Sequence, residues 1–395
     1  MKKRIIFMII NMNVGGTEKA LLNMINGIPR DQYDITILML EKYGGFLKFI
    51  PSDVHVRYFE GYSELKSIYN LPPHVSAKYF IKKGKIFKAI KLIYLCFLSK
   101  IKKDRGAFLE FILKGYPAVG IKYDIAIAYA GPMDLITYYV LNKIEAKTKV
   151  QWVHFDVTKM GFNRLFESSM YKKFDKIFVV SKEGRNKLIN MIPDIKDKTE
   201  VFSNIVSSNL INNQAKEGKG FKDKFNGLRI LTVGRLTSEK GQDLAIRALA
   251  RLIEEGYNVK WYCVGEGNSR EKYEDLINEY NLKDRFIFLG ADPNPYSYID
   301  QCDIYVQPSR HEGYCITLAE ARCLNKPIVT TDFTGAREQI KYGKTGLIVS
   351  INDTDIYLGV KELLDNQDLR NEFTYNLSKE TQDSKGHIKK LYNLI

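Results

Sequence analysis

The sequence has few cysteines, and their arrangement excludes several classes of protein. Only five cysteines occur in 395 residues, and no two of them form a C-x-x-C pair. An odd, dispersed set suits neither a disulfide framework nor a zinc knuckle, and it fits a reducing compartment. The glycines after the first apolar run are not spaced G-x-G-x-x-G, which disfavours a nicotinamide site.

Long apolar runs are absent as well. The longest, residues 92–98, is far shorter than the roughly 18 residues of a membrane-spanning helix. Near the N-terminus a run of about six apolar residues follows three basic ones, which is too short for a signal sequence, so we interpret it as a buried strand. With 45% apolar and 27% charged residues, the chain is expected to be soluble and globular, and it is long enough for two domains.

Acidic residues are scarce in one segment of the N-terminal half. Residues 1–200 carry a net charge of +15, whereas residues 201–395 carry −1. Most of the excess lies in Lys78–Arg105, where ten basic residues accompany one acid. Apolar and aromatic residues alternate there with lysines at helical spacing, a pattern suited to an anionic membrane face. The lysines expected to contact the membrane are Lys82, Lys83, Lys85 and Lys88.

Two other interpretations of this basic segment stay open. Nucleic acid is the rival partner, although no recognised binding motif accompanies the segment, so no nucleic-acid partner is expected. The segment could also be an ordinary surface helix that packs its apolar side on the N-terminal domain, and such packing is compatible with membrane contact.

Short apolar runs alternate with longer amphipathic stretches along the chain, a pattern typical of βαβ units and parallel sheets. Strands are expected at residues 4–10, 34–38, 54–58, 124–129, 150–153 and 176–180, and again at 229–233, 260–264, 285–289, 304–307, 327–331 and 346–350. We therefore predict an α/β protein with two doubly wound, Rossmann-like domains that face each other across a cleft.

The domain boundary is expected in the polar, breaker-rich stretch 207–227. This divides the chain into an N-terminal domain of residues 1–206 and a C-terminal domain of residues 207–375. Residues 376–395 are expected to form a helix that packs back toward the N-terminal domain.

Two of the loops that follow predicted strands suit a phosphorylated ligand. Gly15 and Gly16 stand between a strand and a helix, where their backbone can approach a phosphate, although such a pair can also be a simple tight turn. Arg235 and Lys240 follow the first strand of the second set. Two cations there suit a diphosphate, whose negative charge grows when it leaves. Either cation alone could be an ordinary surface charge.

A third loop carries two glutamates. Glu312 follows the predicted strand 304–307, and Gly313 permits a sharp turn into a helix whose first N–H groups, at Ile316, Thr317 and Leu318, can bind an anion. Glu320 lies further along that helix and can face the same cleft. Two carboxylates beside a phosphate are costly unless they accept hydroxyl hydrogen bonds, so a sugar and a ribose are indicated.

These motifs together resemble a known family. Glu312 and Glu320 are separated by seven residues, preceded by S-R-x-E-G and followed by A-R-x-x-x-x-P-I-V-T-T-D. This resembles the signature of the retaining glycosyltransferases of family 4, of the bacterial surface or capsular polysaccharide type, which have the GT-B fold. The resemblance also covers the Gly15–Gly16 pair and the G-R-L-x-x-E-K-G segment, and it spans about 330 residues.

The resemblance implies a role for each residue. Glu312 contacts hydroxyls of the donor sugar, Glu320 holds the ribose, and Arg235 with Lys240 neutralises the departing diphosphate. The backbone at Gly16 and at residues 316–318 lies next to the phosphates. His154, which follows a predicted strand, resembles the histidine that lies near the donor anomeric carbon; taken alone, a histidine is more often structural.

The implied reaction moves a sugar, with retention, from a nucleotide sugar, most commonly UDP-linked, to an acceptor. No metal or other cofactor is required, and Asp353-Thr-Asp355 is interpreted as a helix cap rather than a manganese site. Because the basic segment lies in the acceptor domain, the acceptor is expected to be a polyprenyl-diphosphate-linked saccharide, used by a cytoplasmic protein held peripherally at the inner face of the cell membrane.

The alternatives are an epimerase or hydrolase of nucleotide sugars with the same fold, and a transferase acting on a protein or a teichoic acid. A membrane or nucleic-acid adaptor without enzymatic activity is disfavoured, because the cations and glutamates of the expected site are all present.

Overall fold

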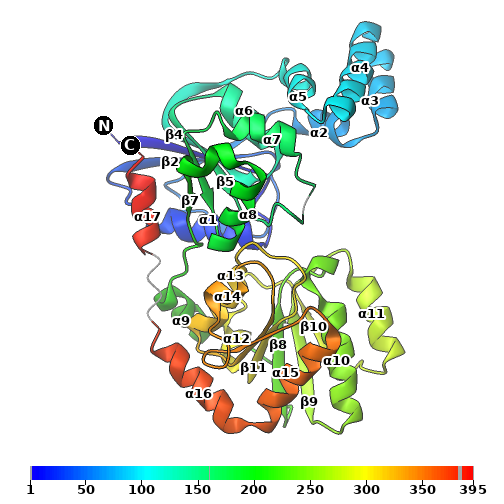
Figure 1. The fold of residues 1–395 in the computed structure, drawn as a ribbon, viewed down its shortest axis with the longest axis vertical. Coiled ribbons are helices and arrows are strands. Elements are labelled where there is room, and N and C mark those ends of the chain that lie inside the picture. Colours follow the sequence, from blue (N-terminus) through cyan, green and yellow to red (C-terminus); the bar gives the residue numbers. More distant parts are fainter. Residues whose placement is uncertain (1, 160, 381–384, 395) are drawn as a thin grey trace.

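The chain folds around two parallel β-sheets, one in each half (Figure 1). The computed structural model describes residues 2–159, 161–380 and 385–394. The first sheet has seven strands in the order β3-β2-β1-β4-β5-β6-β7. Its strands are β1 (Lys3–Ile9), β2 (Tyr33–Met39), β3 (His55–Tyr58), β4 (Val119–Gly131), β5 (Ile144–Val153), β6 (Lys176–Val179) and β7 (Thr199–Val201).

The second sheet has six strands in the order β10-β9-β8-β11-β12-β13. They are β8 (Leu228–Val233), β9 (Val259–Val264), β10 (Phe286–Gly290), β11 (Ile304–Gln307), β12 (Ile328–Thr331) and β13 (Leu347–Val349). In both sheets the chain crosses over helices between parallel strands, which is the doubly wound arrangement. The predicted fold class, two Rossmann-like α/β domains, is therefore confirmed.

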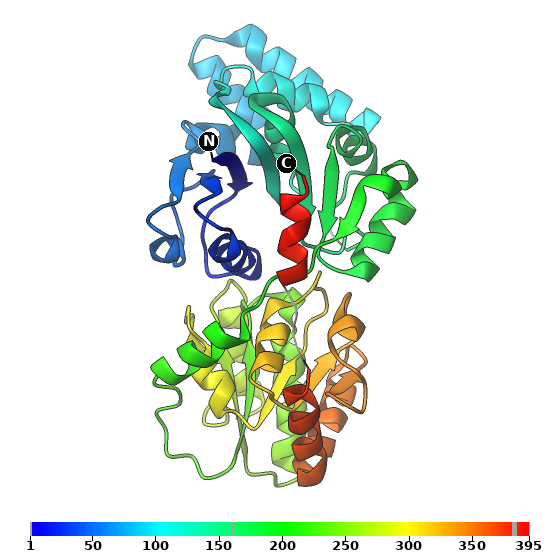
Figure 2. The ribbon, with the colours of Figure 1, turned by 90° about the vertical axis from the view of Figure 1, so that its left-hand side faces the viewer.

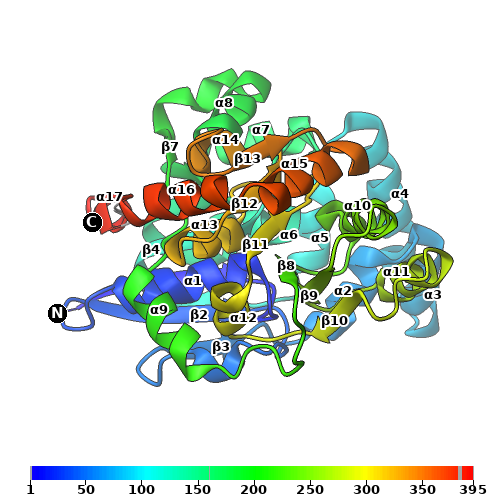
Figure 3. The same cartoon turned by 90° about the horizontal axis from the view of Figure 1, so that it is seen from below.

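Helices cover both sheets and extend beyond them (Figures 1 and 3). The N-terminal half contains α1 (Gly16–Gly27), α2 (Tyr62–Asn70), α3 (Pro73–Lys82), α4 (Ile86–Lys102), α5 (Gly106–Leu113), α6 (Asp134–Lys143), α7 (Arg164–Tyr171) and α8 (Lys182–Met191). The C-terminal half contains α9 (Ser208–Glu217), α10 (Gln242–Glu254), α11 (Arg270–Glu279), α12 (Tyr296–Gln301), α13 (Ile316–Cys323), α14 (Ala336–Gln339), α15 (Asp353–Asp365), α16 (Gln367–Ser378) and α17 (Lys385–Tyr392). Single 3₁₀ turns lie at Leu47–Phe49, Pro193–Lys198 and Ser238–Lys240.

The central strands of both sheets are buried on both faces. All five residues of Ile5–Ile9 in β1 are fully buried, as are Ile230 and Leu231 in β8. Strands covered by helices on both sides have apolar residues at nearly every position rather than in alternation. This property explains why the sequence predicted the central strands well.

Every predicted strand exists, but two short elements depart from the prediction. Strand β7 was not predicted, because its three residues include only one aliphatic side chain. Part of the stretch 207–227, where the domain boundary is predicted and no helix was expected, forms α9. In α9 the Ser207 hydroxyl accepts a hydrogen bond from the Leu210 N–H, and Ile211 and Ala215, one turn apart, are buried in the C-terminal half.

The basic segment forms two helices instead of one. Helix α3 ends at Lys82 and α4 begins at Ile86, because Gly84 adopts a positive φ of 70° between them. Together α3 and α4 project from the end of the N-terminal domain that is remote from the C-terminal domain (Figures 1 and 2).

The last helix returns to the N-terminal domain, as Figure 2 shows for α17. Leu391 is fully buried in the N-terminal core, and the Tyr392 ring stacks on Tyr33 at 5.2 Å. The Lys390 ammonium donates to the Val201 carbonyl at 2.6 Å. Residues 381–384 of the predicted C-terminal segment lie outside the described residues.

This packing predicts that Leu391→Ala destabilises the N-terminal domain by about 2–5 kcal/mol, the usual effect of truncating a buried leucine. The control, Leu358→Ala, changes a leucine that is 52% exposed and should alter stability by about 0.5 kcal/mol or less. Urea denaturation followed by tryptophan fluorescence measures both. Equal midpoints for the two variants would contradict the packing of α17.

Candidate active site

The predicted site residues converge where the two domains touch. They follow the carboxyl ends of β1, β5, β8 and β11, which point toward the opposite domain (Figure 1). Backbones approach closely at two glycines. A Cβ on Gly313 would lie 1.9 Å from the His154 carbonyl oxygen, and one on Gly16 would lie 3.3 Å from Ile316 Cγ2. Helices α1 and α13 lie next to each other at this junction (Figure 3).

Glu312 forms a nearly buried ion pair. Its Oε1 atom lies 2.5 Å from the Lys240 ammonium, and the two side chains are only 9% and 19% exposed. Burial, the largest single effect, lowers the pKa of Lys240, but the charge of Glu312, its hydrogen bond and the nearby Cys315 together leave that pKa raised. Lys240 therefore stays protonated. The ion pair joins one of the two predicted cations to one of the two predicted glutamates.

Glu320 is buried beside an aromatic hydroxyl and a lysine from the other domain. Its Oε1 atom accepts a hydrogen bond of 2.7 Å from Tyr296, and the residue is 3% exposed. Burial raises the pKa of Glu320, whereas the charge of Lys19 and the Tyr296 hydrogen bond lower it. The Lys19 ammonium, from α1, lies 5.0 Å from the centre of the Tyr296 ring.

Lys19 and Tyr296 were not among the site residues predicted from the sequence. Lys19 lies three residues after the glycine pair in G-G-T-E-K, and this spacing is a usable signal for proximity to the site. Tyr296 lies in no motif, so only the fold could bring it to Glu320.

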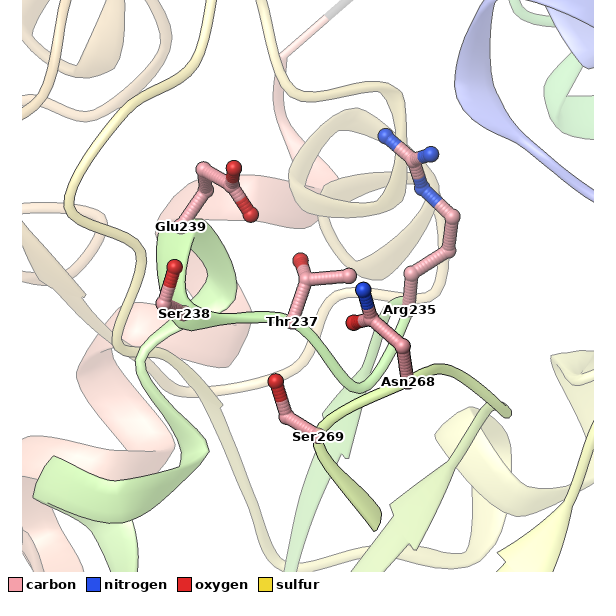
Figure 4. Close-up of a pocket in the computed structure, with 6 residues that line it drawn as sticks. All are labelled: Arg235, Thr237, Ser238, Glu239, Asn268 and Ser269. Atoms are coloured by element: carbon pink, nitrogen blue, oxygen red, sulfur yellow. The ribbon is translucent and has the colours of Figure 1, made fainter. Parts of the chain in front are cut away.

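Arg235 lines an open cavity of about 400 Å³. The other lining residues are Thr237, Ser238, Glu239, Asn268 and Ser269. Figure 4 shows Arg235 and Asn268 extending side by side from two neighbouring loops. In the described part of the chain the Arg235 guanidinium makes no ion pair, so it is available to an anionic ligand, unlike Lys240.

The N-terminus of α13 faces the same junction. Cys315 precedes it with a positive φ of 56°, so the chain turns sharply and the helix begins at Ile316. The N–H groups of residues 316–318 belong to the first turn, where backbone donors have no partner within the helix. They lie close to the glycine pair, since Gly16 approaches Ile316.

His154 is buried and neutral. Burial lowers its pKa to about 3, against a smaller opposing effect of a hydrogen bond with the Tyr129 backbone. Its Nε2 atom is buried and lacks a hydrogen-bond partner among the residues that the structure describes. Because the ring is neutral and Tyr129 engages one side of it, Nε2 can accept a hydrogen bond from a ligand hydroxyl.

A cluster of polar residues that the sequence did not predict holds the domains together. Asp156 accepts hydrogen bonds from Lys187 at 2.8 Å and from Thr334, in the other domain, at 2.7 Å. The Glu338 carboxylate accepts from the backbone N–H groups of Lys182 and Glu183 at 2.9 and 2.8 Å. It thereby caps the N-terminus of α8 from the opposite domain. We call these residues the interdomain clamp.

The four lysines predicted to contact a membrane lie on α3, on α4 and in the turn between them, and all are exposed. Lys82, Lys85 and Lys88 make no ion pair within the described residues. Lys83 departs from the prediction in part, since its ammonium lies 3.2 Å from a Glu64 carboxylate oxygen.

No group of histidines, cysteines and carboxylates within residues 2–159, 161–380 and 385–394 is arranged to hold a metal ion. Asp353 and Asp355 lie in the first turn of α15, and the cap is Asn352, whose side chain accepts from the Asp355 N–H at 2.7 Å. The motif does lie at the start of a helix, as predicted, but the capping residue is Asn352, just before the motif. Among the described helices, none has the length and apolar character to cross a membrane.

Solved structures define the class of fold. Anabaena HepE, crystallised with UDP and glucose, has a TM-score of 0.72 at 17% identity over 99% of this chain and 98% of HepE. Staphylococcus aureus TarM has a TM-score of 0.69 at 15% identity over 100% of this chain and 99% of TarM. The chain thus has the GT-B fold, the fold predicted from the sequence.

A sequence comparison shows what the C-terminal domain resembles. Residues 214–380 match the model of the glycosyl transferases group 1. The C-terminal domain is thus similar to this family, and the match contains the loop and helix that carry Glu312 and Glu320.

Curated relatives share a similar region. A Campylobacter jejuni N-acetylgalactosamine-N,N'-diacetylbacillosaminyl-diphospho-undecaprenol 4-alpha-N-acetylgalactosaminyltransferase is 34% identical over 53% of this chain and 56% of its own length. The Staphylococcus aureus capsular polysaccharide biosynthesis glycosyltransferase CapM is 28% identical over 44% of this chain and 46% of its own length. The aligned region therefore spans about half the length of these relatives.

Glu18, on α1 near Arg235, predicts a pH effect. Burial raises the pKa of Glu18 to about 7, although a hydrogen bond with its own backbone and the charge of Arg235 act in the opposite direction. The folded protein therefore holds this proton more tightly than the unfolded chain does. The resulting stabilisation is complete below the pKa of Glu18 in the unfolded chain and is lost as the pH rises through about 7.

Between pH 4.5 and 8 the melting temperature of Glu18→Gln should therefore rise relative to that of the wild type, because glutamine cannot ionise. Glu372→Gln, at an exposed position on α16, serves as the control and should keep the wild-type profile. Parallel melting profiles for Glu18→Gln and the wild type would show that Glu18 is not held in a buried site.

Proposed function

We propose that this protein is a retaining glycosyltransferase that moves a sugar from a nucleotide diphosphate sugar to a saccharide carried on a polyprenyl diphosphate. The observation that carries the proposal is the junction where Arg235, the Lys240–Glu312 pair and Glu320 meet the N-terminus of α13. Cations and helix N–H groups suit a diphosphate, and buried carboxylates suit hydroxyls.

Each group has a place in binding the donor. Glu320, backed by Tyr296, accepts the ribose hydroxyls, while the N–H groups of residues 316–318 and of the Gly15–Gly16 turn face the phosphates. The carboxylate of Glu312 and the neutral Nε2 of His154 accept hydrogen bonds from hydroxyls of the donor sugar. UDP is the nucleotide we favour, since HepE was crystallised with UDP.

In the transfer step, the bond between the anomeric carbon and the diphosphate oxygen breaks, and the acceptor oxygen bonds to the same face of that carbon. The acceptor proton passes to the departing diphosphate, so the sugar keeps its anomeric configuration. Arg235, Lys240 and the N-terminus of α13 stabilise the negative charge that develops on the leaving group. The reaction in this proposal requires no metal or other cofactor.

The acceptor is proposed to be lipid-linked, and the protein to work peripherally at the cytoplasmic face of the membrane. The Campylobacter relative is named for an undecaprenyl-diphosphate-linked substrate. Helix α4 buries Ala89, Leu92 and Leu95 within the protein. On its other side it exposes Phe87, Ile90, Ile93, Tyr94, Phe97 and Ile101, each between 47% and 89%. Apolar side chains flanked by lysines without acidic partners suit an anionic lipid surface.

The role of Glu312 is tested with Glu312→Gln, which keeps the size of the side chain but removes its charge. Sugar transfer should fall by at least about 100-fold, because the sugar hydroxyls lose a charged acceptor and the nearly buried Lys240 loses its ion-pair partner. The control Glu372→Gln should retain full activity. Reactions run with and without acceptor separate transfer from epimerisation and hydrolysis. Undiminished transfer by Glu312→Gln would contradict its role.

The membrane proposal is tested by changing Lys82, Lys83, Lys85 and Lys88 together to glutamate. Each lysine near an anionic surface contributes about 1 kcal/mol, so binding should fall by about 100-fold or more. The matched control makes the same charge change at four exposed lysines of the C-terminal domain, Lys222, Lys224, Lys272 and Lys283. Sedimentation with phosphatidylglycerol-containing vesicles measures binding. Equal binding of the two variants would refute a specific membrane face.

A further inference from the structure

A row of buried polar side chains lies behind Glu312. Tyr305, Gln307 and Ser309 alternate along the end of β11 and are all fully buried. The Tyr305 hydroxyl lies 2.8 Å from Gln307 Oε1, and Gln307 Nε2 lies 2.8 Å from Ser309 Oγ. Ser309 Oγ lies 2.8 Å from Glu312 Oε1. The Thr317 hydroxyl, on α13, reaches Gln307 Oε1 at 3.1 Å.

The direction of each hydrogen bond in this row follows from the carboxylate. An ionised Glu312 can only accept, so the single hydroxyl proton of Ser309 must point to it. The Ser309 oxygen can then only accept from Gln307, and this places the amide nitrogen of Gln307 on that side. The amide oxygen consequently faces Tyr305 and Thr317, which both donate to it. One assignment satisfies all five groups.

The row leaves the two oxygens of Glu312 in different states. Oε1 receives two donors, Lys240 at 2.5 Å and Ser309 at 2.8 Å. Oε2 has no partner in the described part of the chain, and the side chain keeps 9% of its surface exposed. The backbone that carries Ser309 is held as well, since the Thr331 hydroxyl donates to its carbonyl at 2.5 Å.

We propose that Ser309 and Gln307 are positioning residues that fix the Glu312 carboxylate with Oε1 occupied and Oε2 directed to the hydroxyls of the donor sugar. This inference rests on the proposed function. Lys240 alone could not fix the carboxylate, because an ammonium donates equally well to either oxygen and rotates about a flexible stem. The hydroxyl of Ser309 comes from a buried strand end, so it selects one oxygen.

We call this chain of hydrogen bonds from Gln307 through Ser309 to Glu312 the relay. It should affect the binding of the donor sugar and not that of the nucleotide. Ser309→Ala should weaken the binding of UDP-glucose or UDP-N-acetylgalactosamine by about tenfold, as expected when a hydrogen bond to a charged group is lost. UDP lacks the sugar, so its dissociation constant should not change. Isothermal titration calorimetry with these three ligands gives the ratio of the UDP-sugar dissociation constant to the UDP dissociation constant. Tyr305→Phe is the control, because Thr317 still donates to Gln307, and its ratio should stay within about twofold of the wild type.

Gln307→Glu gives a second, independent readout. A protonated carboxyl at this position can donate to Ser309 as the amide does, whereas a carboxylate cannot. The affinity of this variant for UDP-sugars, relative to its affinity for UDP, should therefore fall by about tenfold between pH 6 and pH 9. The charged and titratable groups nearby, Tyr305, Glu312, Cys315 and Lys240, are common to the wild type, so the difference between the two profiles isolates position 307.

The outcomes separate the relay from the proposed function. If the wild-type protein binds UDP-sugars but Ser309→Ala changes UDP and UDP-sugar affinity equally, or if the Gln307→Glu ratio does not vary with pH, the relay is wrong and the proposed function stands. If the wild-type protein binds none of the three ligands, the proposed function fails, and the relay fails with it.

Discussion

The constraint on which the whole arrangement depends is that two parallel sheets direct the carboxyl ends of their strands toward each other. Every loop that carries a candidate site residue follows such an end, so residues more than 300 positions apart in the chain converge on one junction. At this junction the structure has little spare room. The backbones of Gly313 and His154 leave no space for a Cβ between them, and Lys19 of one domain is near enough to Glu320 of the other for their charges to interact. The interdomain clamp around Asp156 and Glu338 keeps the domains in this relation.

The fold was predictable from the sequence because its central strands are apolar at nearly every position. The short strand β7 and helix α9 were not, since their few buried residues are set by neighbours from other parts of the chain. In the site, the two glutamates, the two cations and the glycine turns were found as motifs. Which cation pairs with which glutamate was not, because the Lys240–Glu312 pair depends on how two loops approach in space.

The contacts that no motif contains are those between the domains and within the buried core of the site. Asp156 and Thr334 lie 178 positions apart, and Tyr296 and Glu320 lie on two different helices, so only the packed structure brings each pair together. The place of the excess positive charge of the N-terminal half also became clear only from the fold. It is concentrated on α3, on α4 and in the turn that joins them, at the end of the molecule remote from the junction, which is the surface that we propose contacts the membrane.

The central claim is that this junction transfers a sugar with retention of configuration. The most direct test is to supply an α-linked UDP-sugar together with a polyprenyl-diphosphate-linked saccharide and to determine the new linkage by proton NMR, using the coupling constant of the anomeric proton. We predict a product with an α linkage and stoichiometric release of UDP. A β-linked product would contradict the retaining mechanism, and release of free sugar without a new linkage would contradict transfer itself.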